Sequence, residues 1–204
     1  MKARLPHILL GVYIAQFIAL AINPYSRDVW VAENIPMVLI ALFLAASYRR
    51  FRFSNASYVL MSVLVFLHTV GGHYTFERVP FGFATDLFGF TRNHYDRIAH
   101  FSVGFYAYPI AEYLYRKGLT ASKGLMAFTG ITAIFTVAAV YEIIEWWYAA
   151  SADPAAGIAF LGSQGDIWDA QKDMLADGLG AICAAIYFLL AYRLPASGKG
   201  TTEA

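Results

Sequence analysis

The sequence predicts an all-α membrane protein, a polytopic bundle of about six transmembrane helices that forms a single domain. Of its 204 residues, 59% are hydrophobic and only 14% are charged, whereas soluble domains carry about 25% charged residues. The mean hydropathy is +0.51, which excludes an ordinary soluble enzyme. We expect one transmembrane domain over residues 1–195 and a flexible cytoplasmic tail at 196–204.

Six apolar stretches approach the roughly 20 residues that a helix needs to cross a bilayer. They cover residues 5–22, 34–48, 56–71, 98–115, 124–149 and 174–192. The second is expected to open near Asn34, with Pro36 in its first turn, where the missing N–H of proline is tolerated. Pro109 lies inside the fourth stretch and removes the amide donor to the Phe105 carbonyl, which predicts a kink.

The first stretch has two interpretations. Lys2 and Arg4 precede an apolar core that ends at Ala19–Ala21, which is the layout of a cleavable signal peptide. The rest of the chain is already embedded in the membrane, and Pro24 is unfavourable for processing. An uncleaved signal-anchor is therefore the simpler interpretation, with cleavage as the alternative.

Basic residues are distributed unequally between the two sides of the predicted bundle. One side carries ten: Lys2, Arg4, Arg49, Arg50, Arg52, Arg116, Lys117, Lys123, Arg193 and Lys199. The other side carries five: Arg27, Arg78, Arg92, Arg97 and Lys172. The positive-inside rule then places both termini in the cytoplasm. A net charge of +1 provides no basic excess for binding nucleic acid. Because the chain lies in the membrane, the expected partners are membrane lipids and a lipid-linked substrate.

Four predicted spans carry ionisable side chains at nearly the same depth. Counted from the basic residue at each inner edge, His68 and His100 lie 16 residues away, Glu142 lies 19 away and Asp173 lies 20 away. At 1.5 Å per residue these separations are about 24–30 Å, in the outer leaflet or at its surface. Charged groups within a membrane usually face the bundle interior. We therefore expect these side chains to converge on one cavity.

Helical spacing and residue type together indicate a metal site. Glu142 and Glu145 are three residues apart, and Asp169, Asp173 and Asp177 step by four, so each set lines one helix face. Mixed carboxylate and imidazole ligands are typical of divalent metals. We expect His100, Glu142 and Asp173 to hold a divalent ion such as Zn, Mn or Mg.

Catalytic roles follow from the same group. Asp96 lies four residues before His100 and therefore on the same face. Glu145 or Asp96 is expected to accept a proton, and His68 or His73 to donate one, in a metal-dependent reaction on a lipid or lipid-linked envelope molecule.

Two other interpretations stay open. In the first, the cluster is a structural network, in which Arg97 reaches into the group and neutralises two carboxylates. Asp166 and Asp169 then have a structural role as well, since they are expected to cap the sixth span. In the second functional class, a non-catalytic envelope protein binds a lipid, an antibiotic or an ion in the same cavity, or conducts protons along its carboxylates and histidines.

Four segments carry a resemblance to a known family. They are HTVGGHY at 68–74, NHYDRIAHF at 93–101, YEIIEW at 141–146 and GDIWDAQKDM at 165–174. These segments resemble the YjdF family of bacterial inner-membrane proteins, and the match spans nearly the whole chain. The resemblance implies the inner-membrane location without naming a reaction.

A more distant similarity to VanZ-like proteins, which are associated with glycopeptide resistance, is carried by DRIAHF at 96–101, EIIE at 142–145 and Asp173. That pattern commonly has Gln at the position of Glu145 and Asn near Asp177. These departures weaken any transfer of ligand chemistry from VanZ-like proteins to this chain, because they fall on acids that we expect to act as ligands or catalysts.

Overall fold

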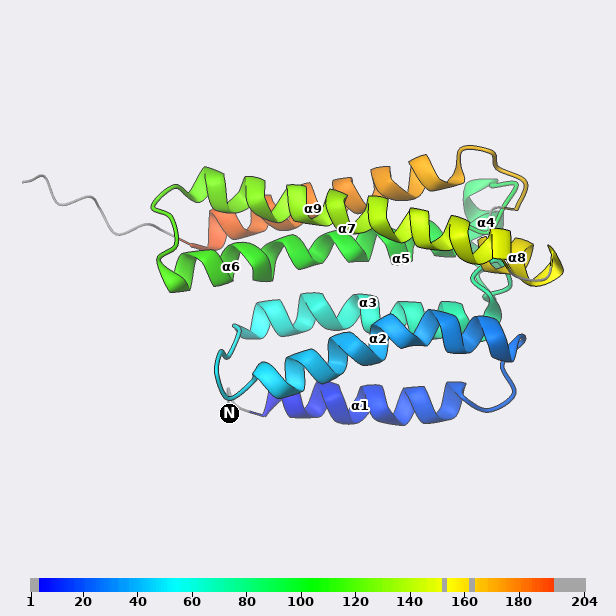
Figure 1. Cartoon of the computed structure of the whole chain (residues 1–204), viewed down its shortest axis with the longest axis horizontal. Coiled ribbons are helices and arrows are strands. Elements are labelled where there is room, and N and C mark those ends of the chain that lie inside the picture. The colour runs from blue at the N-terminus through cyan, green and yellow to red at the C-terminus, as the bar shows by residue number, and fades with distance from the viewer. Residues whose placement is uncertain (1–3, 152–153, 162–163, 193–204) are drawn as a thin grey trace, which may run out of the picture.

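The computed structural model describes residues 4–151, 154–161 and 164–192, and every regular element in this part of the chain is a helix (Figure 1). The predicted all-α fold class is therefore confirmed. The predicted tail at 196–204 lies outside the described residues.

The long helices lie side by side along one axis in two groups (Figure 1). The first group contains α1 (Leu5–Leu20), α2 (Arg27–Ser47) and α3 (Asn55–Tyr74). The second contains α5 (Tyr95–Val103), the 3-10 turn η1 (Gly104–Tyr106), α6 (Ala107–Lys117), α7 (Lys123–Ser151) and α9 (Asp169–Ala191). Contacts between α3 and α5 join the two groups. The short helices α4 (Gly82–Phe88) and α8 (Pro154–Leu161) lie at one end.

The number of spans agrees with the sequence prediction. Among the described residues, α2, α3, α7 and α9 are long and apolar enough to cross a membrane. Helix α1 is a shorter apolar helix, and its Gln16 side chain donates to the Phe66 carbonyl of α3 over 2.8 Å. The consecutive segments α5, η1 and α6 occupy the position of the predicted fourth span. About six spans is therefore consistent with this bundle.

The start of the second span was predicted wrongly. Helix α2 begins at Arg27 rather than near Asn34, and Pro36 lies inside it. The Ser26 hydroxyl accepts a hydrogen bond from the Val29 amide over 3.4 Å, and Asp28 lies in the first turn. This N-cap and the favourable charge stabilise the earlier start, and membrane helices tolerate an internal proline. The earlier start places Glu33 within the helix.

The predicted irregularity near Pro109 is present about one turn earlier. The 3-10 turn η1 separates α5 from α6 and contains Phe105, whose carbonyl lacks the Pro109 amide as a helical donor. Gly104 starts this turn and packs against the backbone of α9, where an added Cβ would lie 2.2 Å from the Ala181 nitrogen. The interruption therefore coincides with a close backbone contact between η1 and α9.

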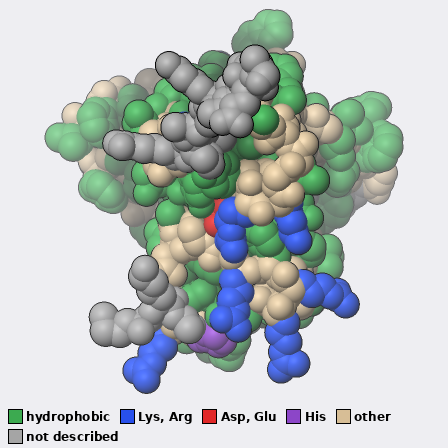
Figure 2. Space-filling view, turned by 90° about the vertical axis from the view of Figure 1, so that its left-hand side faces the viewer, with side chains coloured by type: hydrophobic (Ala, Val, Ile, Leu, Met, Phe, Trp, Pro, Cys, Tyr) green, Lys and Arg blue, Asp and Glu red, His purple; other side chains and the backbone are tan. Residues whose placement is uncertain are grey.

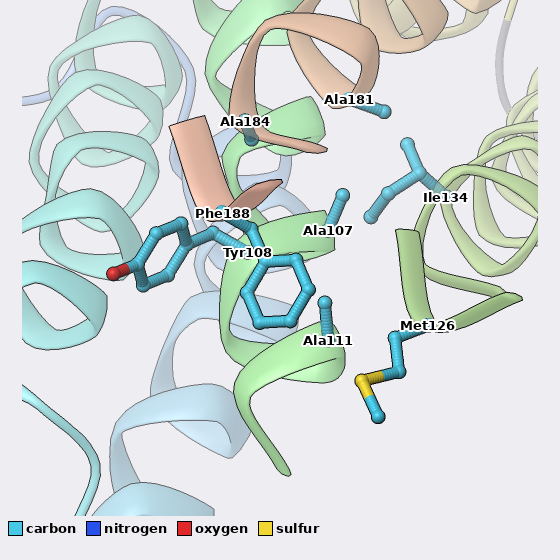
Figure 3. Close-up of a cluster of buried hydrophobic side chains, with 8 residues drawn as sticks. All are labelled: Ala107, Tyr108, Ala111, Met126, Ile134, Ala181, Ala184 and Phe188. Carbon is cyan, nitrogen blue, oxygen red and sulfur yellow. The ribbon is translucent and has the colours of Figure 1, made fainter. Parts of the chain in front are cut away.

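Small residues let α6, α7 and α9 pack closely. Figure 3 shows one buried cluster, formed by Ala107, Tyr108, Ala111, Met126, Ile134, Ala181, Ala184 and Phe188. Alanine side chains permit close backbone approach, which is a common basis of helix association in membranes. This packing fixes the rotation of α9 relative to its neighbours.

The two ends of the bundle differ in charge. Figure 2 faces the end at which α6 finishes and α7 starts, and it shows Lys and Arg side chains in the centre and lower part of this face. We call this the basic end, defined by the exposed residues Arg49, Arg50, Arg52, Arg116 and Lys117. The short helices α4 and α8 lie at the opposite end (Figure 1).

A buried carboxylate that is not predicted from the sequence connects α6 to α3 at the basic end. Glu112 is fully buried and accepts hydrogen bonds from the Ser54 amide over 2.8 Å, the Ser54 hydroxyl over 2.9 Å and the Ser57 hydroxyl. Arg116 lies one turn along and pairs with it over 2.8 Å. Because its bonding capacity is filled by these groups, Glu112 holds the start of α3 in place.

Candidate functional site

A second and larger group of ionisable residues lies toward the end that carries α4 and α8. Asp96 and His100 come from the first turns of α5, and Asp169, Asp173 and Asp177 from the first turns of α9. Four-residue spacing puts each set on one face, and α5 packs against α9. The two faces therefore meet in the carboxylate–histidine cluster, which we define as these five residues with Glu33, His68, Tyr141, Glu142 and Glu145.

His100 lies at the centre of the cluster. Its Nε2 is 3.7 Å from Oδ1 of Asp96 and 3.6 Å from Oδ1 of Asp173. Its Nδ1 lies 3.2 Å from Oδ1 of Asp177. An ionised carboxylate only accepts hydrogen bonds, so Asp177 favours the proton on Nδ1. Nε2 is then directed at the other two acids.

One set of ligand atoms is close enough to hold a metal ion. Ligand atoms of Asp96, His100 and Asp173 all lie within 4.8 Å of one another, and the two aspartates are buried. Ligands about 2.1 Å from a tetrahedral zinc ion lie about 3.4 Å apart, which is close to the two distances from His100 Nε2. Small side-chain movements therefore suffice to bring these atoms into a coordination shell.

Arg97 enters the same group. Its guanidinium bonds to the carboxylates of Asp169 and Asp173, and its distance to Oδ2 of Asp96 is 3.5 Å. This is the neutralising arrangement on which the structural interpretation depends. Since Arg97 and His100 share Oδ1 of Asp173, a metal ion there would compete with the guanidinium.

The ion-pair network continues toward the end of the bundle. Arg92 pairs with Asp169 over 3.0 Å and with Asp166 over 3.2 Å, and Lys172 pairs with Asp166 over 2.6 Å. The pKa of Asp166 lies below its ordinary value because Lys172 and the Trp168 amide donate hydrogen bonds to it. Of the two predicted capping acids, Asp166 accepts a backbone N–H near the start of α9, whereas Asp169 bonds to the two arginines.

Helices α2, α3 and α7 add a hydrogen-bonded chain beside the α5 and α9 residues. Glu33, buried at 2% exposure, accepts from His68 Nε2 over 2.8 Å and from the Tyr141 hydroxyl over 3.1 Å. The ring of Phe76 packs edge-on against His68 at 5.0 Å. This chain links three helices that are distant in sequence.

A small cavity connects the two halves of the cluster. It has a volume of about 10 Å³ and is lined by Glu33, His68, Phe76, Asp96, His100, Tyr141, Glu145 and Leu161. A polar space of this size holds about one water molecule. Imidazole and carboxylate groups from four helices therefore face a space for a single water or ion.

The structure brings together most of the predicted site residues. His68, Asp96, His100 and Glu145 line the cavity, and Asp173 contacts His100. Glu142 lies within electrostatic reach of His100 and Asp173, and in the described part of the chain its buried Oε1 has no hydrogen-bond partner. These six residues occupy one region.

His73 lies elsewhere. It is in the last turn of α3, where its Nδ1 donates to the Leu20 carbonyl over 2.8 Å and its ring packs against Tyr74. It does not line the cavity, so its position favours a contact between α1 and α3.

Glu33 and Tyr141 belong to the cluster but are not predicted from the sequence. Glu33 falls outside a span that opens near Asn34, although Ser26 and Asp28 mark the earlier helix start that includes it. Tyr141 directly precedes Glu142, but a tyrosine near a membrane interface is common and carries little signal by itself. Only its contact with Glu33 reveals it as part of the cluster.

Negative charge exceeds fixed positive charge in this region. Eight carboxyl groups lie in the cluster or next to it: Glu33, Asp96, Glu142, Glu145, Asp166, Asp169, Asp173 and Asp177. Among the described residues, the fixed cations that pair with them are Arg92, Arg97 and Lys172. Buried carboxylates without a partner bind protons or cations, so the region favours a cationic ligand.

Comparison with known proteins agrees with the resemblance that the four segments carry. Residues 5–193 match the family described as "Predicted membrane protein (DUF2238)". The chain is also 33% identical over 168 residues to the inner membrane protein YjdF of Escherichia coli (strain K12), an alignment that covers 81% of this chain and 80% of the relative. No solved structure matches the chain.

Proposed function

Because the chain belongs to the DUF2238 family of predicted membrane proteins, we propose that the carboxylate–histidine cluster of this multi-pass inner-membrane protein is a divalent-metal site of an enzyme. The reaction class that we propose is metal-assisted hydrolysis of a lipid or lipid-linked envelope molecule. This location suits such a substrate, since the helices that form the cluster also expose apolar side chains such as Ile144 and Leu175.

The proposal rests on one observation, the convergence of ligand atoms from Asp96, His100 and Asp173 within 4.8 Å in a region rich in carboxylates. Asp177 supports the arrangement, because a carboxylate on the far ring nitrogen orients a ligating histidine. The unpartnered Oε1 of Glu142 is a further donor atom available to a cation. A bound divalent ion would act as a Lewis acid or lower the pKa of a water molecule.

The remaining cavity residues suit proton transfer. Glu145 faces the same cavity as His100 and is the residue that we assign as proton acceptor. His68 is the residue that we assign as proton donor, because it lines the cavity and Glu33, 2.8 Å from its Nε2, fixes the orientation of its ring. His73 has no part in this assignment, since it lies against Leu20.

We expect protein purified without a metal-chelating tag, and then loaded with Zn, Mn or Mg, to bind about one equivalent of ion, measured by elemental analysis. His100→Gln and Asp173→Asn remove ligands and should abolish this binding while the protein stays folded. Asp177→Asn should weaken it by about 10–100-fold, as is typical of groups that orient a ligand. The control is Asp86→Asn, an exposed acid of α4, which should bind like the wild type.

A failure to bind metal supports the second candidate function, that of a non-catalytic envelope protein. Wild-type protein that binds none of Zn, Mn and Mg under these conditions contradicts the divalent-metal site. The pairing of Arg97 with Asp169 and Asp173 favours a non-catalytic envelope protein in that case, which binds a lipid, an antibiotic or an ion, with the cluster as a structural network.

We also propose that the basic end faces the cytoplasm, so that both termini are cytoplasmic and the cluster lies toward the outer surface. In a Cys183→Ala background, a maleimide that cannot cross the membrane should label Thr91→Cys in intact cells and leave Ala121→Cys unlabelled. Both positions are exposed, and they lie in connections at opposite ends of the bundle. Labelling of Ala121→Cys but not of Thr91→Cys would show that the protein has the opposite orientation.

A further inference from the structure

An apolar cavity lies between α1, α2 and α3, away from the carboxylate–histidine cluster. It has a volume of about 190 Å³, and its walls include Leu9, Leu10, Leu44, Met61, Val65 and Phe66. These residues come from the first half of α1, the last half of α2 and the part of α3 that ends near its midpoint, at Phe66. The cavity therefore occupies the half of the bundle that is nearer to the basic end.

The apolar cavity continues into a second one with a different lining. The second has a volume of about 500 Å³ and includes Arg52, Ser54 and Asn55 in its walls. Pro6, Tyr48 and Tyr58 line both cavities. The combined space is apolar inside the bundle and gains a basic and two polar side chains where the chain leaves it, which is the amphipathic pattern of a phospholipid.

The second cavity carries positive charge that, within the described residues, has no acidic partner. The connection at 48–54 contains Arg49, Arg50 and Arg52 and no acidic residue. Its nearest buried acid, Glu112, is already bonded to Ser54, Ser57 and Arg116. The Arg52 guanidinium lies 5.0 Å above the ring of Tyr48, beside both cavities. An anionic headgroup is therefore favoured over a zwitterionic one.

The backbone of this connection is held in place. Arg116 donates to the Arg52 carbonyl, and its guanidinium lies 4.4 Å from the ring of Phe51. Glu112 anchors Arg116 in turn. A binding group on a rigid segment loses less entropy when it engages a ligand.

We propose that these two cavities form one binding site for an anionic phospholipid, with an acyl chain between α1, α2 and α3 and the phosphate at Arg52. The site is independent of the metal site and of any enzymatic activity. The lipid that binds there comes from the leaflet that contacts the basic end.

The test uses delipidated full-length protein in a neutral detergent, titrated with phosphatidylglycerol and, in parallel, with phosphatidylcholine. Native mass spectrometry measures bound lipid, and thermal unfolding measures protection. We expect phosphatidylglycerol to bind more tightly than phosphatidylcholine, and Arg52→Gln to weaken it by about fivefold, the typical effect of one basic residue at a membrane surface. The matched control is Lys117→Gln, which removes an exposed positive charge at the same end but lines neither cavity.

A second variant tests the apolar part. Ala45 lines the first cavity and is exposed on α2, so the Ala45→Phe variant should fold. Its phenyl ring should occupy the space of the acyl chain and weaken the binding of phosphatidylglycerol relative to the wild type. Equal losses in Arg52→Gln and Lys117→Gln would overturn the proposal, because they indicate general attraction to a basic surface. Unchanged binding in Ala45→Phe, or equal protection by inorganic phosphate alone, would also overturn it.

Discussion

Arg97→Met is expected to lower the free energy of unfolding by about 3–5 kcal/mol, the usual consequence of removing one partner from a buried ion pair. Arg97 bonds to both Asp169 and Asp173, and these carboxylates are buried at 8% and 3% exposure. Without the guanidinium they must take up protons or remain charged in a poorly solvated place. Unfolding in mixed micelles, followed by circular dichroism, measures the change.

The matched control is Arg78→Met. Arg78 pairs with Glu77 over 3.3 Å, but its side chain is 51% exposed, and an exposed pair contributes about 0–1 kcal/mol. Equal effects of the two substitutions would contradict a buried network at Arg97.

The same variant separates the network from the metal site. Arg97→Met releases Oδ1 of Asp173, which the guanidinium shares with His100. If the proposed metal site exists, adding a divalent ion should stabilise Arg97→Met more than the wild type. A network without a metal site predicts no such difference. Asp169→Asn should still recover part of the stability lost in Arg97→Met, because it removes one carboxylate from a region in which acids outnumber the fixed cations.

Gly180→Val is expected to cost about 3 kcal/mol or more, at the upper end of overpacking effects. A Cβ at this position would lie 1.9 Å from the carbonyl oxygen of Phe101, a backbone atom that cannot rotate away. Helix α9 must therefore move away from α5 and η1. Since His100 meets Asp173 and Asp177 across this contact, the substitution should also abolish the proposed metal binding.

Gly11→Val is the control for that substitution. Gly11 also lies in an apolar helix, but a Cβ there has nothing within 4 Å. Its effect should stay below about 1 kcal/mol, the range of helix propensity. Similar losses of stability at the two positions would show that close packing between α5 and α9 does not support the site.

The sequence by itself determined the fold class and the helix faces. Apolar length predicts a membrane helix because the bilayer imposes the same requirement on each segment separately. Four-residue spacing predicts that Asp96 and His100 share a face, and that Asp169, Asp173 and Asp177 do, because the geometry of one helix decides it. Both predictions need only local information, and the structure agrees with both.

Only the tertiary structure decided which of these groups meet. Arg97 bonds to acids more than 70 positions away, and Glu33 joins His68 and Tyr141 from two other helices. Such pairings depend on how each helix is rotated and how closely it approaches its neighbours, which Gly104 and Gly180 set at a backbone contact. Composition and spacing along one segment carry no information about that rotation. For this reason the sequence alone leaves a metal ligand set and a neutralised ion-pair network equally compatible with the same acids.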